Sequence, residues 1–397
     1  PPGGGGGGGI SDRGALDRPV GPSPLVTDPD TVADTRVGRA PWGVDVTGRD
    51  RAISLHQRHM LITGLSDNGK TAAMRALALW VARDPGADLW IADLKGPAGW
   101  AMFDGIADRL VIGPTDEHVI AATEMLEDAV VEMQRRFQVG GSHRPLFVVV
   151  DEAQVAYMCP AKDPAKRPFG GQSNDARYLG AVRKIHNQGR AVDVTLWEAT
   201  QDPTNQNLPV LSREGNHVRA SLVVGTEAQA KMALGEAAVA GGAAPQELRR
   251  GLDKGALVVA GSGLEMEPWE VAVTVRTHYI DDATATQIAK RALIARQKAQ
   301  QASTPTADPV DDLAAILAAL RGEERVRTTA VLARLVADRP DRYRPWTAAT
   351  LTAVLTAAGA PPRKRSTMKV SRTDLLAAIV ARDAHQTGAM AGGPIRG

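Results

Sequence analysis

The chain has 397 residues, of which 43% are hydrophobic, so it is long enough for one large core and a smaller second domain. Its formal net charge is only +2, which excludes a polycation that binds nucleic acid over its whole surface. A single cysteine, Cys159, excludes an internal disulfide and a cysteine-based metal cluster. No stretch reaches the ~20 apolar residues that cross a bilayer. Residues 1–9 lack the apolar core of a signal peptide, so we expect a cytoplasmic protein without an intrinsic membrane span.

Composition divides the chain into four parts. Residues 1–40 are rich in Gly, Pro and Asp, which predicts a disordered N-terminal segment. Over 41–280, short apolar runs alternate with helical patterns, which is typical of a parallel sheet covered by helices. Residues 281–309 predict a polar, alanine-rich helix followed by a linker, and 310–390 predict a separate small domain.

The larger part predicts seven strands and three long helices. The expected strands cover 59–63, 89–93, 109–112, 146–151, 194–200, 218–224 and 256–260. The expected helices cover 71–83, 117–137 and 174–188. Segments 202–217 and 235–250 have little periodicity and predict loops. The alternation indicates an α/β fold.

Residues 64–71, Gly-Leu-Ser-Asp-Asn-Gly-Lys-Thr, match the phosphate-binding pattern G-x-x-x-x-G-K-[ST] between a predicted strand and a predicted helix. Gly64 and Gly69 let backbone amides approach a phosphate at the positive end of the helix. We expect Lys70 to pair with the β- and γ-phosphate oxygens of ATP, and Thr71 to hold Mg²⁺ through its hydroxyl.

Two residues of this loop are atypical. Asp67 and Asn68 occupy positions where many such loops carry small residues. Both tolerate left-handed backbone conformations, so the turn can form and both belong to the predicted nucleotide site. A carboxylate near phosphate is unfavourable unless it faces solvent, which leaves weaker nucleotide binding open.

The apolar run 146–150 ends in two acids, Asp151 and Glu152. At the tip of a buried strand, Asp151 is expected to hold Mg²⁺ through water, and Glu152 to polarise the attacking water. A helix-capping Asp followed by a solvated Glu is the structural alternative. The phosphate-binding loop about 80 residues upstream favours the catalytic interpretation.

Gln201 follows the predicted strand 194–200. Next to the acidic strand, this position places the amide beside the γ-phosphate as a sensor. A surface amide without a role is the alternative.

Six short motifs follow one another along residues 42–280: HMLITG at 59–64, IADLKG at 91–96, VDE at 150–152, GRA at 189–191, ATQ at 199–201 and GALV at 255–258. In this order they resemble the FtsK/SpoIIIE family of DNA translocases, which includes septal DNA pumps and actinobacterial plasmid-transfer proteins. The resemblance implies a RecA-like P-loop core that assembles as a homo-hexamer around double-stranded DNA and is driven by ATP.

The same resemblance implies that an arginine reaches the γ-phosphate of the neighbouring subunit, and Arg190 and Arg219 are the candidates. The sequence departs from the family at Asp67-Asn68, and at Asp202, where the family often has a basic residue. These departures bear on the rate of hydrolysis more than on the fold.

Residues 310–397 carry 14 Lys/Arg and 8 Asp/Glu, a net charge of +6, so the remaining 309 residues sum to −4. This asymmetry favours the C-terminal part as the DNA-reading domain. Helices expected at 311–321, 327–338 and 347–358, followed by the basic segment 363–372, suit a winged-helix-like α+β domain, with the third helix as recognition helix and the basic segment as wing. A basic run that is only a solvated turn remains the alternative. The candidate DNA contacts are Arg363, Lys364, Arg365, Lys369 and Arg372.

Three functional hypotheses follow. The first is an ATP-driven double-stranded DNA translocase in conjugative DNA transfer or chromosome segregation. The second is a DNA-binding regulator whose P-loop domain only senses nucleotide. The third, a type IV secretion coupling ATPase, is disfavoured because the sequence shows neither the membrane helices nor the helical insertion usual in those proteins.

Overall fold

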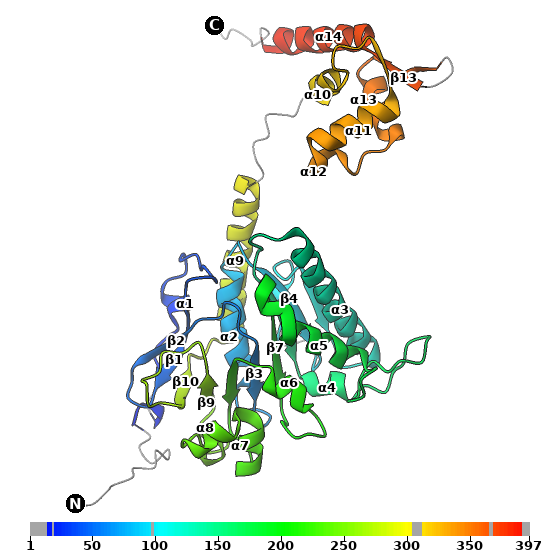
Figure 1. Cartoon of the computed structure of the whole chain (residues 1–397). Coiled ribbons are helices and arrows are strands. Elements are labelled where there is room, and N and C mark those ends of the chain that lie inside the picture. Colours follow the sequence, from blue (N-terminus) through cyan, green and yellow to red (C-terminus); the bar gives the residue numbers. More distant parts are fainter. Residues whose placement is uncertain (1–13, 18–19, 97–98, 304–311, 365–367, 391–397) are drawn as a thin grey trace, which may run out of the picture. The chain divides into compact units, whose positions relative to one another are not determined.

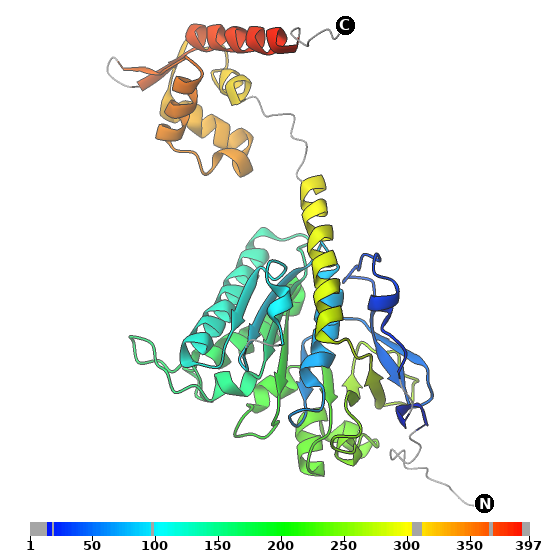
Figure 2. The ribbon, with the colours of Figure 1, turned by 180° about the vertical axis from the view of Figure 1, so that it is seen from behind.

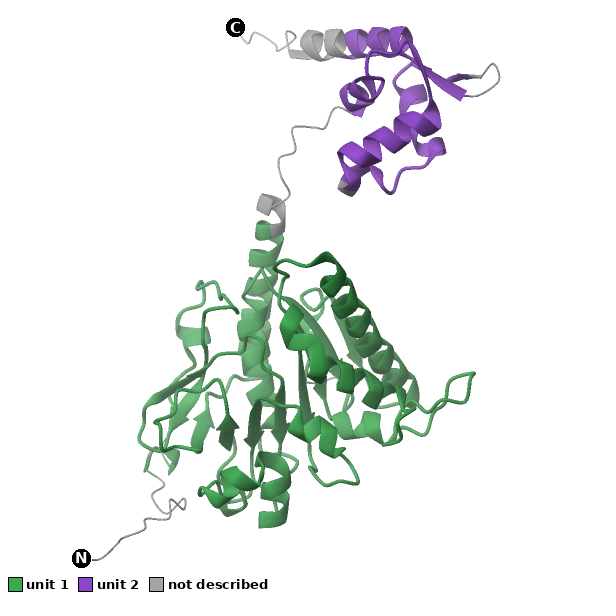
Figure 3. Cartoon of the chain, viewed as in Figure 1, with its two compact units in different colours: residues 1–300 green, residues 301–397 purple. Residues whose placement is uncertain are grey.

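A computed structural model describes residues 14–17, 20–96, 99–303, 312–364 and 368–390. The chain separates into two compact units, unit 1 (residues 1–300) and unit 2 (residues 301–397), which Figure 3 shows in green and purple.

Unit 1 is built on a ten-stranded sheet with the order β2-β1-β10-β9-β8-β3-β7-β6-β4-β5. The six strands from β8 to β5 are parallel, whereas β9, β10, β1 and β2 extend the sheet in antiparallel fashion. Every residue of β6 is buried, as expected for a parallel strand with both faces covered. The strands are β1 (Ala40–Asp45), β2 (Asp50–Ile53), β3 (Met60–Thr63), β4 (Asp88–Asp93), β5 (Arg109–Ile112), β6 (Leu146–Asp151), β7 (Val194–Thr200), β8 (Val218–Ser221), β9 (Ala256–Gly261) and β10 (Ala272–Thr277).

Helices cover both faces of this sheet. On one face α2 (Lys70–Ala82) and α9 (Asp282–Ser303) share an apolar cluster with the strands, and Figure 2 shows the yellow α9 beside the blue α2. On the other face α3 (Asp116–Val139) and α5 (Arg177–Gln188) form a second cluster (Figure 1). The result is a three-layered α/β fold. The shorter helices are α1 (Pro24–Thr27), α4 (Ala153–Tyr157), α6 (Val210–Glu214), α7 (Glu227–Leu234) and α8 (Glu236–Ala240), with 3₁₀ turns η1 (Gly14–Asp17), η2 (Ala101–Phe103), η3 (Gly189–Val192) and η4 (Pro245–Glu247).

Helix α9, expected as a linker helix, packs as part of unit 1. Its residues Ala285, Ile288 and Ala292 are buried in the apolar cluster that includes α2. The buried guanidinium of Arg296 donates to the carbonyl oxygens of Ala82 (2.9 Å) and Ala87 (2.8 and 2.9 Å). The predicted polar, alanine-rich helix is therefore held within unit 1 by small apolar side chains and one buried arginine.

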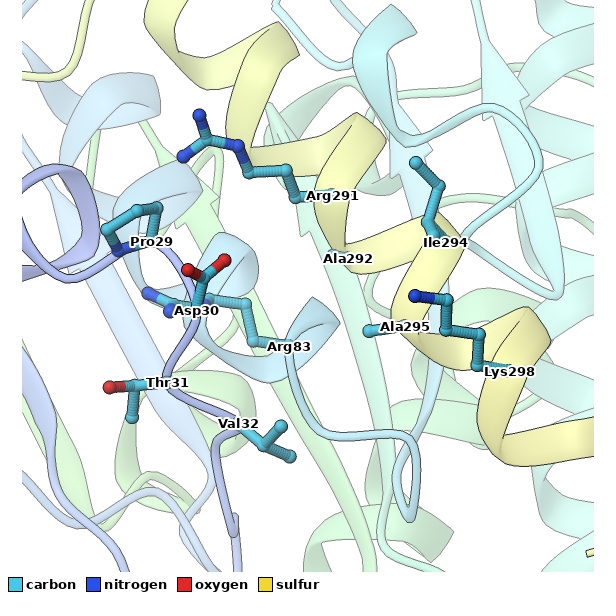
Figure 4. A pocket seen from close by; sticks show the side chains of 10 residues that line it. All are labelled: Pro29, Asp30, Thr31, Val32, Arg83, Arg291, Ala292, Ile294, Ala295 and Lys298. Atoms are coloured by element: carbon cyan, nitrogen blue, oxygen red, sulfur yellow. The ribbon is translucent and has the colours of Figure 1, made fainter. Parts of the chain in front are cut away.

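The expectation of disorder over 1–40 is wrong for residues 20–39. Leu25 is buried, and the amide and hydroxyl of Thr35 both donate to Asp84 (2.8 and 2.7 Å). Figure 4 shows residues 29–32 across a small cavity of about 210 Å³ from Arg83 and the side of α9. The segment lacks periodicity because it is anchored by single buried side chains instead of a continuous apolar face.

The seven strands predicted within unit 1 all form, with small differences at their ends. The prediction missed β1, β2 and β10, whose exposed and half-buried positions give no continuous apolar run. It also missed the short helices α6 and α8 in segments expected to be loops. One turn of helix carries too little periodicity to be recognised.

Unit 2 combines helices with a three-stranded antiparallel sheet of order β11-β13-β12. Its own core gathers apolar side chains such as Ile316, Val331, Leu351 and Val370. The elements are α10 (Asp312–Ala319), β11 (Arg325–Arg327), α11 (Thr328–Asp338), α12 (Pro340–Tyr343), α13 (Ala348–Ala357), β12 (Arg363–Lys364), β13 (Met368–Ser371) and α14 (Arg372–Met390).

Candidate functional site

The phosphate-binding loop lies between β3 and α2, as the motif requires. Gly64 and Gly69 have φ angles of +148° and +100°, in the region that favours glycine. A Cβ on Gly64 would lie 2.7 Å from the Cβ of Leu222, and one on Gly69 would lie 3.2 Å from the backbone nitrogen of Gly255. The chain therefore needs glycine at both ends of the turn.

The two atypical residues of the loop take different positions. Asp67 adopts a left-handed conformation (φ +64°) and is exposed, so its carboxylate faces solvent. Asn68 is buried and its side-chain amide donates to the carbonyl oxygens of Leu65 (3.2 Å) and Ser66 (2.8 Å). Asn68 thus stabilises the turn from within, whereas the exposed Asp67 lines the cavity at the loop.

The loop and the acidic strand meet at the carboxyl edge of the sheet. The Thr71 hydroxyl donates to Oδ2 of Asp151 (2.7 Å), and the indole of Trp100 donates to the same oxygen (3.0 Å). A hydroxyl and a carboxylate are the protein ligands that suit Mg²⁺, which usually keeps several waters and binds substrate phosphates. The residues present therefore fit a Mg²⁺–nucleotide complex.

Glu152 lies between Lys70 and Gln201, two residues that the sequence analysis assigns to the same site. Its Oε1 is 3.0 Å from Nζ of Lys70 and accepts a hydrogen bond from Nε2 of Gln201 (2.8 Å). Glu152 itself has a left-handed backbone (φ +60°), a conformation that is costly for a non-glycine residue and common at functional sites. Burial raises the pKa of Glu152, but the Lys70 ammonium and the amides of Gln154 and Gln201 outweigh it, so the pKa lies below its usual value.

A third carboxylate at this edge was missed as a site residue. Asp93 ends β4 and lies opposite Asp151 in the strand register. Burial, together with the charges of Asp151 and Glu152, raises the pKa of Asp93 to about 6, against the backbone amide of Lys95, which lowers it. Nζ of Lys95 is 3.9 Å from Glu152. The IADLKG motif contains both residues, but only the strand register brings them to the site.

A cavity of about 250 Å³ opens at the N-terminus of α2, and Lys70, Thr71 and Glu152 are among the residues that line it. Arg75 lines it and donates to Oδ1 of Asp282 (2.7 Å) and to the carbonyl oxygen of Ile280 (2.9 Å). The hydroxyl of Ser66 donates to Oε1 of Gln201, which joins the loop to the end of β7. Sequence reasoning gave no signal for Arg75 or Ser66.

The two predicted arginines lie away from this cavity in the same chain. Arg190 is in η3, before β7 begins, and its NH1 is 2.8 Å from Nε2 of His217. Arg219 lies in β8 and lines a different cavity of about 440 Å³, together with Arg213. Burial lowers the pKa of Arg219. Neither arginine therefore lines the cavity at the phosphate-binding loop.

The predicted DNA-binding residues fall on the sheet and last helix of unit 2. Arg363 is exposed and its Nε lies 3.2 Å from Oδ2 of Asp374. Lys369 is exposed on β13, and Arg372 is half-buried at the start of α14. Arg365 and the side chain of Lys364 lie outside the described residues.

Within the part of the chain that the structure describes, no helix combines the length and apolarity needed to cross a membrane.

Comparison with known proteins gives one curated relative and several similar structures. No model of a protein family matches the sequence. Protein Tra of Streptomyces lividans is 29% identical over 220 residues, which cover 53% of this chain and 35% of that protein. The similarity thus spans about a third of the relative's length.

Two solved structures share the fold at low sequence identity. The pCW3 conjugation coupling protein TcpA, a monomer with ATPγS, matches with a TM-score of 0.51 and 17% identity, over 66% of this chain and 72% of that one. The cytoplasmic domain of the Thermomonospora curvata type VII secretion ATPase EccC matches with a TM-score of 0.53 and 17% identity, over 69% and 34% of the two chains. These matches agree with the RecA-like architecture of the parallel sheet.

Proposed function

We propose that this chain is a P-loop ATPase of the FtsK/SpoIIIE type. In this proposal it is an ATP-driven double-stranded DNA translocase that works in conjugative DNA transfer or in chromosome segregation. The observation that carries the proposal is the meeting of Lys70, Thr71, Asp151, Glu152 and Gln201 at one edge of the sheet. The sequence relative, which is named as a Tra protein, supports DNA as the cargo.

Lys70 and Thr71 would bind the phosphates and the metal. Nζ of Lys70 is buried beside Glu152, so a γ-phosphate entering the loop offers it a second anionic partner. Thr71 and Asp151 would hold Mg²⁺, which when bound neutralises charge on the β- and γ-phosphates. The N-terminus of α2 adds its partial positive charge.

Glu152 is placed to act as the base. Its lowered pKa keeps it ionised at neutral pH, so it can orient a water molecule and accept its proton as the water attacks the γ-phosphorus and the bond from that phosphorus to the leaving ADP breaks. Gln201 donates to the same carboxylate and also contacts the loop through Ser66. A γ-phosphate in the cavity would compete with Glu152 for the Gln201 amide. Release of that phosphate after hydrolysis would therefore change the contacts of the residue that follows β7.

Arg190 and Arg219 do not line the cavity at the phosphate-binding loop of their own chain, so we assign them a role in a neighbouring subunit. Arg190 is exposed, whereas Arg219 opens into a separate cavity. In a homo-hexameric ring, one of them would complete the site of the adjacent subunit, as arginines supplied in trans do in other P-loop enzymes.

We further propose that unit 2 is a winged-helix domain that binds duplex DNA. Helices α10, α11 and α13 with the sheet β11-β13-β12 support this, since β12 and β13 pair as antiparallel neighbours, as the strands of a wing do. The exposed Arg363 and Lys369 lie on those strands and would contact phosphates. Helix α13 would enter the major groove.

Steady-state ATP hydrolysis by the full chain, with and without duplex DNA, tests the proposal. We expect a several-fold stimulation by DNA, and a Lys70→Ala variant should lose both the basal and the stimulated rate. An equal rate with and without DNA would contradict the translocase. ATP binding without turnover, combined with site-specific DNA binding that Arg363→Ala and Lys369→Ala abolish, would instead support the nucleotide-sensing regulator.

A further inference from the structure

A buried carboxyl group, that of Glu198, lies within β7, the strand that leads to Gln201. Every residue of β7 is buried, and Glu198 has no exposed surface. Because side chains alternate along a strand, Glu198 points to the same face as Leu196, which belongs to the apolar cluster that includes α3 and α5. An ionisable group in such a layer is costly unless it is hydrogen-bonded, so its contacts need an explanation.

Three hydroxyl groups donate to this carboxyl group. Oε1 accepts hydrogen bonds from the hydroxyls of Tyr157 (2.9 Å) and Tyr178 (3.0 Å), and Oε2 accepts one from the hydroxyl of Ser212. The two tyrosine rings also pack edge to face, with their centroids 4.8 Å apart. The donors belong to three different helices, α4, α5 and α6, which Figure 1 shows beside β7. Glu198 therefore ties three helices to one strand.

Two of these helices follow residues of the proposed ATPase site. Helix α4 begins immediately after Glu152 and ends at Tyr157. The segment after Gln201 leads into α6, which contains Ser212. After each of these two site residues, the chain therefore returns to the carboxyl group of Glu198.

Helix α4 needs such an anchor because of the backbone of Glu152. Its left-handed conformation (φ +60°) is unfavourable for a residue other than glycine, and it persists only where the surrounding contacts fix it. Helix α4 has five residues, too few to form a stable helix alone. Contacts at its far end must supply the restraint, and Tyr157 provides them through its hydrogen bond to Glu198 and its packing on Tyr178.

We propose that Glu198 is a positioning residue for ATP hydrolysis, which holds α4, and through α4 the carboxylate of Glu152, in the orientation that activates water. This inference rests on the proposed ATPase function and assigns a further residue to it. Glu198 does not line the cavity at the phosphate-binding loop, so it acts only through the elements that it ties together. Its bond to Ser212 restrains the segment that follows Gln201 in the same way.

The two tyrosines provide a matched pair of variants. Tyr157→Phe and Tyr178→Phe each remove one hydroxyl from the same oxygen, and both side chains are buried, so both should lower the urea midpoint of unfolding to a similar extent. Only Tyr157 belongs to the helix that follows Glu152.

Single-turnover hydrolysis of ATP by the full chain separates the two variants. We expect Tyr157→Phe to lower the rate about 10-fold, because a displacement of about 1 Å at a reacting group can cost up to about 100-fold, whereas Tyr178→Phe stays within about twofold. The Kd for ATP should stay within about twofold in both, because a contact that orients only the base does not contribute to binding.

Substitutions of Glu198 itself separate positioning from stability. Glu198→Gln keeps an oxygen for the two tyrosines and an amide that can donate to Ser212, so it should hydrolyse ATP within about threefold of the wild type. The apolar variant combines Glu198→Leu with Tyr157→Phe, Tyr178→Phe and Ser212→Ala. It removes both sides of every hydrogen bond, a change that leaves stability nearly unaltered, yet we expect it to hydrolyse ATP at least about 10-fold more slowly.

Equal single-turnover rates in Tyr157→Phe and Tyr178→Phe, or a wild-type rate in the folded apolar variant, would overturn the positioning role and leave Glu198 as a support of the fold alone. A loss in Glu198→Gln as large as in the apolar variant would also overturn it. If the apolar variant does not fold, the tyrosine pair decides the question. Failure of the wild-type chain to hydrolyse ATP would overturn the proposed function itself.

Discussion

The parallel strands of unit 1 end beside a cluster of charged groups, and the same strands begin beside a cluster of imidazoles. At the carboxyl edge, Lys70 and Glu152 form a buried pair at 3.0 Å, with Asp151 and Asp93 close by. At the amino edge, His59 and His217 directly precede β3 and β8. Both clusters place ionisable groups in the interior, but the groups at the carboxyl edge are charged and the imidazoles at the amino edge are neutral.

The amino-edge histidines are held uncharged. His59 has its ring centroid 4.8 Å from that of His186 and 5.3 Å from that of His217. Burial, and then the neighbouring imidazoles and Arg190, lower the pKa of His59 well below its usual value. Burial lowers the pKa of His186 to about 4. Nδ1 of His59 accepts a hydrogen bond from the amide of Leu196 (3.0 Å), so a neutral ring has a structural use.

The difference separates a structural from a functional arrangement of buried polar groups. Neutral imidazoles pack against one another and need few partners, so the amino edge can be filled by side chains. Ionised acids and a buried ammonium are costly unless they are paired. Here the pair of Lys70 and Glu152 lines a cavity at the N-terminus of α2. Charges kept at that cost are typical of a site that meets a charged ligand.

The largest effect is expected from Glu152→Gln at the carboxyl edge. Loss of the base should lower kcat about 100- to 10,000-fold. The Kd for ATP should stay the same or fall, because Lys70 loses its anionic partner and becomes free for the phosphates. Nucleotide titration alongside steady-state kinetics measures both quantities.

Glu124→Gln, at an exposed position on α3, is the matched control and should leave both quantities unchanged. If Glu152→Gln lowered stability and ATP affinity but not kcat, Glu152 would only be the structural partner of Lys70, and the two edges would not differ in kind.

A smaller effect is expected from pH at the amino edge. The pKa of His186 is about 4 in the folded chain, below the usual 6.5, so its contribution to stability is present above pH 6.5 and is lost as the pH falls toward 4. This difference of two and a half units between the two pKa values corresponds to at most about 3 kcal/mol in the free energy of unfolding. Urea unfolding between pH 8 and pH 4.5 should show this loss in the wild type.

His186→Leu should reduce the loss, because Nδ1 and Nε2 of His186 are buried without hydrogen-bond partners among the described residues, and leucine cannot become charged. His118→Gln, at a half-buried position near the start of α3, should keep the wild-type pH dependence. An unchanged pH slope in His186→Leu would show that acid unfolding begins elsewhere and would remove the contrast between the edges.

The sequence predicted the carboxyl edge much better than the amino edge. The loop, Asp151 and Gln201 each follow a strand with a strong apolar pattern, and parallel strands bring their ends together. Asp93 ends a strand of the same kind, yet nothing local distinguishes it from any strand-ending acid. Its position beside Asp151 emerges only from the strand register.

The rest of unit 1 was missed for a related reason. The imidazoles of the amino edge come from three separate elements, so no local pattern joins them. Residues 20–39 and the strands β1 and β10 depend on contacts with distant parts of the chain, such as the bond from Thr35 to Asp84 and the pairing of Val44 with Arg276. Patterns within a short window of sequence predict the parallel core, but they carry little information about segments whose partners lie about 50 to more than 200 residues away.

The smallest effect is expected from Asp93→Asn. The raised pKa of Asp93, about 6, means that its contribution to stability is present below the usual value near 3.8 and is lost as the pH rises through 6. Removing the charge should therefore stabilise the protein by about 1–2 kcal/mol at pH 8 and by about half as much at pH 5, which lies midway between the two pKa values. The gain in stability is smaller than the whole pKa shift would give, because the exposed Lys95 side chain can turn toward an ionised Asp93. Urea unfolding in EDTA at both pH values measures the difference, and Asp104→Asn, at an exposed position, is the control. A lower stability of Asp93→Asn than of the wild type at pH 8 would mean that the folded protein stabilises the ionised form of Asp93. The pKa of Asp93 would then not be raised, and burial would not be its dominant influence.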